Sequence, residues 1–158
     1  MLIDNSERLR YALGKVDARS VDELKYPKKA KFWKIFLDPD LAQRMDKVNI
    51  VGLKILAEKS RRYRIVIISG TRKEIVMGHI EKITNESKKL NLDFRIDKIY
   101  YRGRSREKAP DFKERILRSL LLEDKIVEFH DDNEQVLERI KKYGIKCYLW
   151  KNLKPFEY

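Results

Sequence analysis

Arg64-Ile65-Val66-Ile67-Ile68-Ser69-Gly70 is the stretch on which the fold prediction depends. A short apolar run bounded by polar residues is typical of a buried strand, so we expect a strand at 64–68. Similar strands are expected at 97–101, 125–129 and 145–150. Helices are expected between them, at 73–90, 110–122 and 133–143. This alternation requires crossover connections. It predicts an α/β fold with a Rossmann-like parallel sheet and helices on both faces.

The first part of the chain has a different character. A short helix is expected at 6–13, and residues 15–48 are interpreted as irregular and basic. We expect the aromatic cluster to form the core of a small helical cap; its members are Phe32, Trp33 and Phe36. The prediction is a single domain, 1–158, with a cap-like part at about 1–47 and a core at 48–158 that begins with a helix at 48–60.

Composition and charge narrow the class of protein. The chain has 158 residues, 42% apolar and 39% charged, which is typical of one folded domain. A net charge of +12 favours polyanionic partners such as DNA or RNA ends; a heat-adapted surface is the alternative explanation. No apolar run reaches transmembrane length, so no membrane partner is expected. The only cysteine, Cys147, is interpreted as a buried thiol and fits a cytoplasmic protein.

Polar residues stand at the same end of several expected strands. Ser69 follows the strand 64–68, Asp131 and Asp132 follow the third strand, and Lys113 lies in the first turn of a helix. The carboxyl ends of parallel strands meet at one edge. There a hydroxyl can hold a phosphate oxygen, a lysine can neutralise a phosphoryl group, and carboxylates suit Mg2+. Taken singly, these residues are more simply a turn, a solvated lysine and a helix cap. Their order favours a shared site.

Three segments of the chain follow one another in the order and at the spacing of the motifs of a known family. They are Ile65 to Arg72, the stretch from Tyr100 through Lys113, and Glu128 to Asn133. They resemble the second, third and fourth motifs of the haloacid dehalogenase-like phosphohydrolases. The similarity is closest to the phosphatase domain of polynucleotide kinase-phosphatase and its small archaeal and phage relatives. It covers about residues 46–152.

The resemblance implies a Mg2+-dependent phosphatase that acts on a nucleic-acid 3′-phosphate or a nucleotide. It implies that the catalytic residues are Ser69, Lys113 and Asp132, and that Asp131 positions the metal. Gly70, Arg72 and Arg102 are the candidate substrate contacts, and the two arginines can bind the substrate's phosphates; the alternative for these arginines is an ordinary surface charge. The alternative function is a catalytically inactive nucleic-acid-binding or scaffold domain of the same fold.

The attacking carboxylate is the open question. In the family the first motif, Asp-x-Asp-Gly-Thr/Val-Leu, supplies it, and this chain contains no such hexapeptide. In one hypothesis, Leu2 to Leu9 corresponds to the residues after this motif, so that the motif and the first strand lie ahead of Met1. In the other, 32–37 is the first strand, Asp38 the nucleophile and Asp40 the acid/base. The simpler interpretation of Asp38 and Asp40 is a cap or turn, since Asp-Pro favours turn initiation.

Weaker signals remain in two histidines and one loop. His130 is a candidate general base, although we expect a strand-end histidine satisfied by a neighbour. His79 has no metal-ligating partner at suitable spacing, and we interpret it as structural. The arginine-rich stretch 102–108, next to Tyr100 and Tyr101, fits either a solvated loop or a nucleic-acid-binding rim with stacking aromatics.

Overall fold

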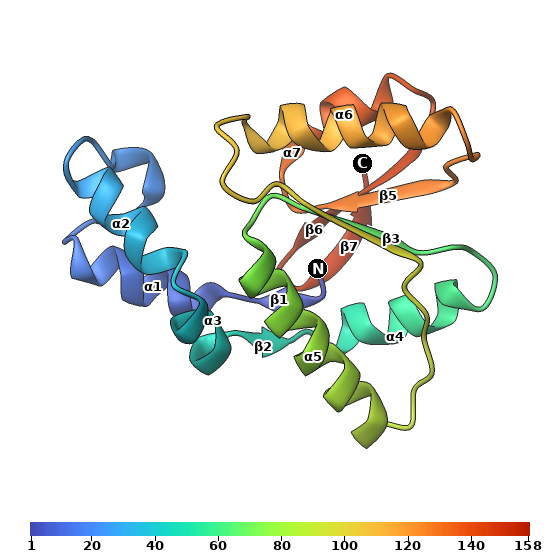
Figure 1. Cartoon of the computed structure of the whole chain (residues 1–158), viewed down its shortest axis with the longest axis horizontal. Coiled ribbons are helices and arrows are strands. Elements are labelled where there is room, and N and C mark those ends of the chain that lie inside the picture. The colour runs from blue at the N-terminus through green and yellow to red at the C-terminus, as the bar shows by residue number, and fades with distance from the viewer.

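The computed structural model describes residues 1–158 and has an α/β architecture with three small sheets (Figure 1). β3 (Val66–Ser69) pairs in parallel with β4 (Lys98–Tyr101), and β5 (Glu128–Asp131) pairs in parallel with β6 (Lys146–Lys151). β7 (Lys154–Glu157) adds an antiparallel edge to β6. β1 (Ile3–Asp4) and β2 (Lys47–Val48) form a separate antiparallel pair.

The expected alternation of helices and strands is confirmed after residue 48. The helices there are α4 (Ile50–Ser60), α5 (Lys73–Lys89), α6 (Ala109–Leu121) and α7 (Glu134–Lys141). Several boundaries differ by one to three residues: for example, Ser69 is the last residue of β3, and β5 begins only at Glu128. The parallel strands are also divided between two sheets, because no ladder joins β3 to β5.

The prediction of an irregular segment at 15–48 is wrong. The N-terminal part of the chain folds into α1 (Ser6–Lys15), the 3-10 helix η1 (Val21–Glu23), α2 (Lys28–Phe36) and α3 (Pro39–Met45). The strand proposed at 32–37 is also wrong, because these residues belong mostly to α2. Phe32, Ile35 and Phe36 recur at helical spacing and pack into one cluster, whose buried members are Ala12, Leu13, Val16, Leu24 and Phe32. The expected core is therefore confirmed for Phe32 and Phe36 but not for Trp33, which is 38% exposed.

The main core lies where α6 and α7 pack on β5 and β6. Its buried residues are Leu117, Val136, Leu137, Ile140, Ile145, Cys147 and Leu149. Cys147 is 2% exposed, which confirms its interpretation as a buried thiol. A smaller cluster joins α4 and α5 through Leu53, Leu56 and Ile83, with Ile65 packed against it. None of the helices combines the length and apolar character needed to cross a bilayer.

Candidate functional site

Lys113 and Asp131 are in direct contact. The Nζ of Lys113 donates to Oδ2 of Asp131 at 2.5 Å, and the two residues are 8% and 1% exposed. The backbone N–H of Asn133 donates to the other carboxylate oxygen at 3.0 Å. Burial raises the pKa of Asp131, and these two donors oppose the rise. The site therefore contains an enclosed ammonium–carboxylate pair.

Local sequence signals position both members of this pair. Pro110 lies in the first turn of α6, where proline is favoured, so that Lys113 is reached one turn into the helix. Asp131 is the last residue of β5. Asn133 then caps α7 by accepting from the N–H of Gln135 at 2.9 Å. Asp132, between the strand and the cap, is exposed.

Ser69 lies at the carboxyl end of β3, next to the start of α6. Its carbonyl accepts from the N–H of Arg102 at 3.0 Å, and its hydroxyl accepts from the N–H of Thr71 at 3.3 Å. A Cβ placed on Gly70 would lie 3.1 Å from Cβ of Ala109, the first residue of α6. The hydroxyl is hydrogen-bonded neither to Lys113 nor to Asp131. The strand end that carries it nevertheless touches the helix that carries Lys113.

Arg102 has an unsatisfied donor near the same strand end. One terminal nitrogen of its guanidinium donates to the carbonyl of Glu107 at 2.8 Å. Its Nε is buried and has no partner, although buried polar atoms are nearly always hydrogen-bonded. An anionic oxygen at Nε would satisfy it. Arg72 is half-buried and stands at the N-cap position of α5, without a side-chain capping bond.

The start of the chain is held against the first turn of α4, which no sequence pattern predicted. Burial lowers the pKa of the Met1 amino group, while the carboxylates of Asp132 and Asp131 oppose the fall. Asn49 holds the segment in place: its side chain donates to the carbonyl of Met1 at 2.7 Å, and its backbone N–H donates to that of Leu2 at 2.8 Å. A Cβ on Gly52 would lie only 2.3 Å from the carbonyl oxygen of Met1, so this approach requires glycine.

His130 is satisfied by its neighbours, which confirms the simpler interpretation of this residue. Trp150 donates its indole N–H to Nδ1 at 3.0 Å, and Nε2 lies 3.4 Å from a carboxylate oxygen of Glu128. Burial lowers the pKa of His130. Side chains alternate along a strand, so His130 points away from the face on which Asp131 meets Lys113.

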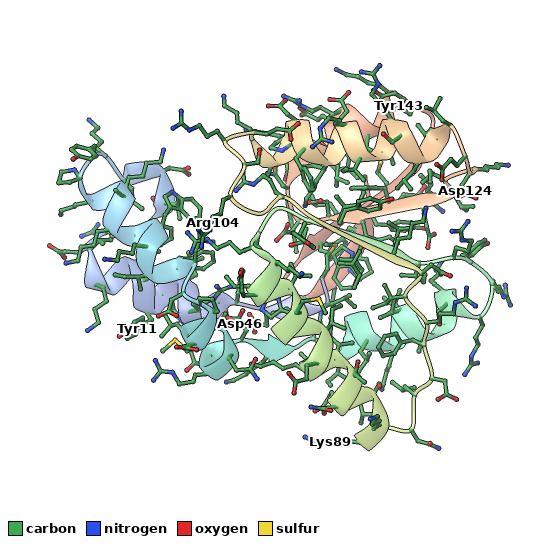
Figure 2. The ribbon with its side chains drawn as sticks, viewed as in Figure 1. Tyr11, Asp46, Lys89, Arg104, Asp124 and Tyr143 are labelled. Atoms are coloured by element: carbon green, nitrogen blue, oxygen red, sulfur yellow. The ribbon has the colours of Figure 1, made fainter.

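His79 is part of a second buried charge cluster, as its structural interpretation predicts. Asp46, drawn in Figure 2, accepts from Arg8 at 2.9 Å and lies 2.7 Å from Nε2 of His79. Arg8 belongs to α1, Asp46 directly follows α3, and His79 belongs to α5. Because these residues are far apart in the sequence, no local pattern predicted their contact. Asp38 is the N-cap of α3 and accepts from the N–H of Asp40 at 2.9 Å, which confirms the cap interpretation of Asp38.

The carboxylates at the site have the donor chemistry that Mg2+ prefers. Asp131 and Asp132 offer only oxygen ligands. Each oxygen of Asp131 accepts one N–H donor, and a carboxylate oxygen has a second lone pair. Asp131 and Asp132 together therefore fit a divalent cation that is ligated by oxygen.

Neither the protein-family models, nor the curated proteins, nor the solved structures give a match to this chain. We therefore infer its function from the chemistry of the site.

Proposed function

We propose that the protein is a Mg2+-dependent phosphomonoesterase with a Rossmann-like core, related to the haloacid dehalogenase-like phosphohydrolases. The observation that carries the proposal is the buried Lys113–Asp131 pair, which lies beside the carboxyl ends of β3 and β5, each a strand of a parallel pair. Burying both charges costs several kcal/mol of desolvation, so such a pair contributes little to stability. Its value lies in presenting an ammonium and a carboxylate where an anion and a cation can bind together.

The side chains divide the work by charge. Lys113 neutralises the phosphoryl group, and the hydroxyl of Ser69 holds one of its oxygens. Asp131 and the neighbouring Asp132 hold Mg2+, which supplies further stabilisation of the developing negative charge. Arg102, with its unsatisfied Nε, and Arg72 hold the substrate's phosphate.

The attacking carboxylate belongs, in this proposal, to a strand ahead of Met1. Asp38 is engaged as a helix cap, which leaves a segment before Met1 as the source of the nucleophile in this proposal. Residues 1–158 contain no Asp-x-Asp-Gly motif that would supply the attacking aspartate. This favours the second candidate, a non-catalytic nucleic-acid-binding domain.

The substrate class follows from charge. The net charge is +12, and the loop between β4 and α6 carries Arg104 and Arg106 in addition to Arg102. Figure 2 shows Arg104 at the side of this loop that faces the N-terminal helices. Such a surface attracts a polyanion, so a 3′-phosphorylated oligonucleotide or a nucleotide is the proposed substrate.

Phosphate release by an extended chain tests the proposal. An apolar strand ending in Asp-x-Asp-Gly is fused before Met1, and p-nitrophenyl phosphate and a 3′-phosphorylated oligonucleotide are supplied with and without Mg2+. The extended protein should release phosphate only with Mg2+, and the chain 1–158 should not. Lys113→Ala and Asp131→Ala should each lower kcat by about a hundredfold or more. The exposed Lys125→Ala is the matched control.

Two outcomes redirect the proposal. If Asp38→Ala abolishes turnover by the chain 1–158 while the circular dichroism spectrum is unchanged, Asp38 is the nucleophile. If no version releases phosphate but all bind the oligonucleotide, the non-catalytic alternative holds.

A further inference from the structure

The segment from Lys25 to Lys34, which includes most of α2, carries positive charge that no other side chain balances. It contains five lysines and no acidic residue, and all five lysines are exposed. None of them takes part in an ion pair, whereas a lysine such as Lys59 is paired with Glu128. The segment therefore presents unneutralised ammonium groups to the solvent.

This pattern of charge works against the stability of α2 itself. Lys28 and Lys29 are the first two residues of the helix, where the helix dipole favours acidic side chains. The helices α1, α3, α5, α6 and α7 each have an acidic residue in the first turn. Lys31 also lies three positions from both Lys28 and Lys34, and like charges at this spacing repel each other. Natural proteins tolerate such local conflicts mainly at functional sites.

Three of the lysines form a row along α2. Lys28, Lys31 and Lys34 follow one another at intervals of three residues, which places them on one side of the helix. Because an α-helix rises by about 1.5 Å per residue, the row spans about 9 Å. One strand of B-DNA carries a charge about every 3.4 Å along the axis. The row therefore fits successive phosphates of one strand better than it fits a single small anion.

Two exposed aromatic rings belong to the same segment. Tyr26 is 88% exposed and Trp33 is 38% exposed. The ring of Trp33 is held in place by the buried Phe32, with the two ring centroids 5.0 Å apart. Ala30 is exposed and lies three positions before Trp33 and four before Lys34, so only a methyl group separates the ring from this lysine. A base can therefore stack on Trp33 beside the row of lysines.

We propose that residues 25–34 bind single-stranded nucleic acid, with its phosphates on the row Lys28, Lys31 and Lys34 and a base stacked on Trp33. Cations that follow the backbone and aromatic rings that accept bases are the elements of single-strand binding without sequence preference. A duplex keeps its bases paired and leaves Trp33 without a partner.

This surface is separate from the candidate phosphoryl site. Figure 1 shows α2 at the end of the molecule that lies away from β5 and β6, and Asp131 is the last residue of β5. The surface adds a place for the body of a strand to the proposed function and does not depend on catalysis.

An oligothymidylate of about 12 nucleotides tests the row of lysines by fluorescence anisotropy. Its 3′ end carries a hydroxyl, so that no terminal phosphate is offered to the candidate phosphoryl site. The triple variant Lys28→Gln, Lys31→Gln and Lys34→Gln should lower the affinity about tenfold or more. The slope of log affinity against log salt should fall by about 0.7 for each lysine that holds a phosphate.

A control triple variant removes the same net charge from exposed lysines elsewhere on the molecule, and its changes are Lys88→Gln, Lys125→Gln and Lys142→Gln. It should lower the affinity by less than about threefold. Arginine at the three positions of the row should retain binding, because the charge is kept. Equal losses from the row and the control variant mean that only net charge matters, and this result overturns the proposal.

Trp33 supplies an internal reporter for stacking. The chain has two tryptophans, and the other, Trp150, is 6% exposed. The oligothymidylate should quench the indole fluorescence of the unchanged chain but not that of Trp33→Phe, which still stacks and should bind normally. Trp33→Leu keeps an apolar side chain without a π-face and should lower the affinity about fivefold or more. Unchanged affinity of Trp33→Leu, or quenching that persists in Trp33→Phe, overturns the proposal.

Other occupants give different results in the same assay. A duplex of the same length that binds more tightly than the single strand overturns the proposal. Vesicles of phosphatidylserine and phosphatidylcholine that bind residues 25–34, while the oligothymidylate is unaffected by the lysine substitutions, overturn it as well.

Phosphate release separates this surface from the proposed function. p-Nitrophenyl phosphate has no strand for α2 to hold, so the substitutions in α2 should leave its hydrolysis by the extended chain unchanged. Binding that depends on α2, without phosphate release by the extended chain, leaves the surface standing and rejects the proposed function. Phosphate release together with binding that ignores α2 rejects the surface alone.

Discussion

His130 and Asp131 are adjacent in the sequence but meet opposite surroundings on the two faces of β5. Asp131 is paired with Lys113, a cation. His130 stacks on Tyr148 with ring centroids 4.7 Å apart and accepts the indole N–H of Trp150. This hydrogen bond requires Nδ1 to lack a proton. Burial lowers the pKa of His130, and the hydrogen bond from Trp150 favours the neutral ring as well.

A pH dependence of stability follows from this histidine. The folded-state pKa of His130 lies below its ordinary value of about 6.5, so the unfolded chain binds more protons as the pH falls. Its contribution to the free energy of unfolding is therefore present above about pH 6.5 and lost below it. His130→Gln should flatten the decline between about pH 7 and pH 5 in urea denaturation. Parallel curves for the two proteins would contradict this assignment.

Among the elements, the N-terminal helices are joined to the rest of the molecule at Asp46, the residue that ends α3. The two-residue strands β1 and β2 make only a short ladder. Asp46 forms an ion pair with Arg8 of α1 and a hydrogen bond with His79 of α5, and Lys82 of α5 donates to the carbonyl of Asp46 at 2.5 Å. The carboxylate of Asp46, which directly follows α3, therefore contacts both α1 and α5.

Neutralising this carboxylate should loosen the N-terminal helices. Asp46→Asn leaves the guanidinium of Arg8, which is 3% exposed, without a countercharge. Breaking a buried pair costs about 3 kcal/mol of stability. Urea denaturation should show this loss, and limited proteolysis should cut within 16–27 before it cuts the core. The exposed Asp40→Asn is the control; a loss below about 0.5 kcal/mol for Asp46→Asn would show that the pair is not the connection.

At the scale of the whole molecule, the excess of 37 basic over 25 acidic side chains is unevenly placed. α2 contains four lysines and no acidic residue, and the loop 102–108 contributes three arginines. Other cations are already paired, such as Lys59 with Glu128. The unpaired excess is the part available to a polyanion.

Oligonucleotide binding should therefore weaken with salt. With about three phosphate contacts to a single strand, affinity should fall about twentyfold between 50 and 200 mM salt. Fluorescence anisotropy with a labelled oligonucleotide measures this fall. Replacing Arg104 and Arg106 by Glu should weaken binding and flatten the salt dependence. The charge-matched replacement of Lys125 and Lys142 should do so less, and equal effects of the two pairs would show that only net charge matters.

Sequence alone determined the order of helices and strands after residue 48. The signals there are local: runs such as Val66-Ile67-Ile68 make buried strands, and Pro110 and Asn133 mark helix starts. The same signals placed Lys113 near the start of a helix and Asp131 at the end of a strand, and folding brings the two side chains into contact. The helix at 28–36 was missed although Phe32, Ile35 and Phe36 carry its spacing, because prolines and lysines around it suggested an irregular segment.

Only the tertiary structure decided which distant groups meet. Arg8 and Asp46 are 38 positions apart, and His130 and Trp150 are 20 apart, so no short-range pattern links them. The division of the parallel strands between the β3-β4 and β5-β6-β7 sheets also depends on which distant strands pair. The physical reason is that helix and strand signals act within a few residues, whereas burial, ion pairing and strand pairing depend on neighbours brought together by folding.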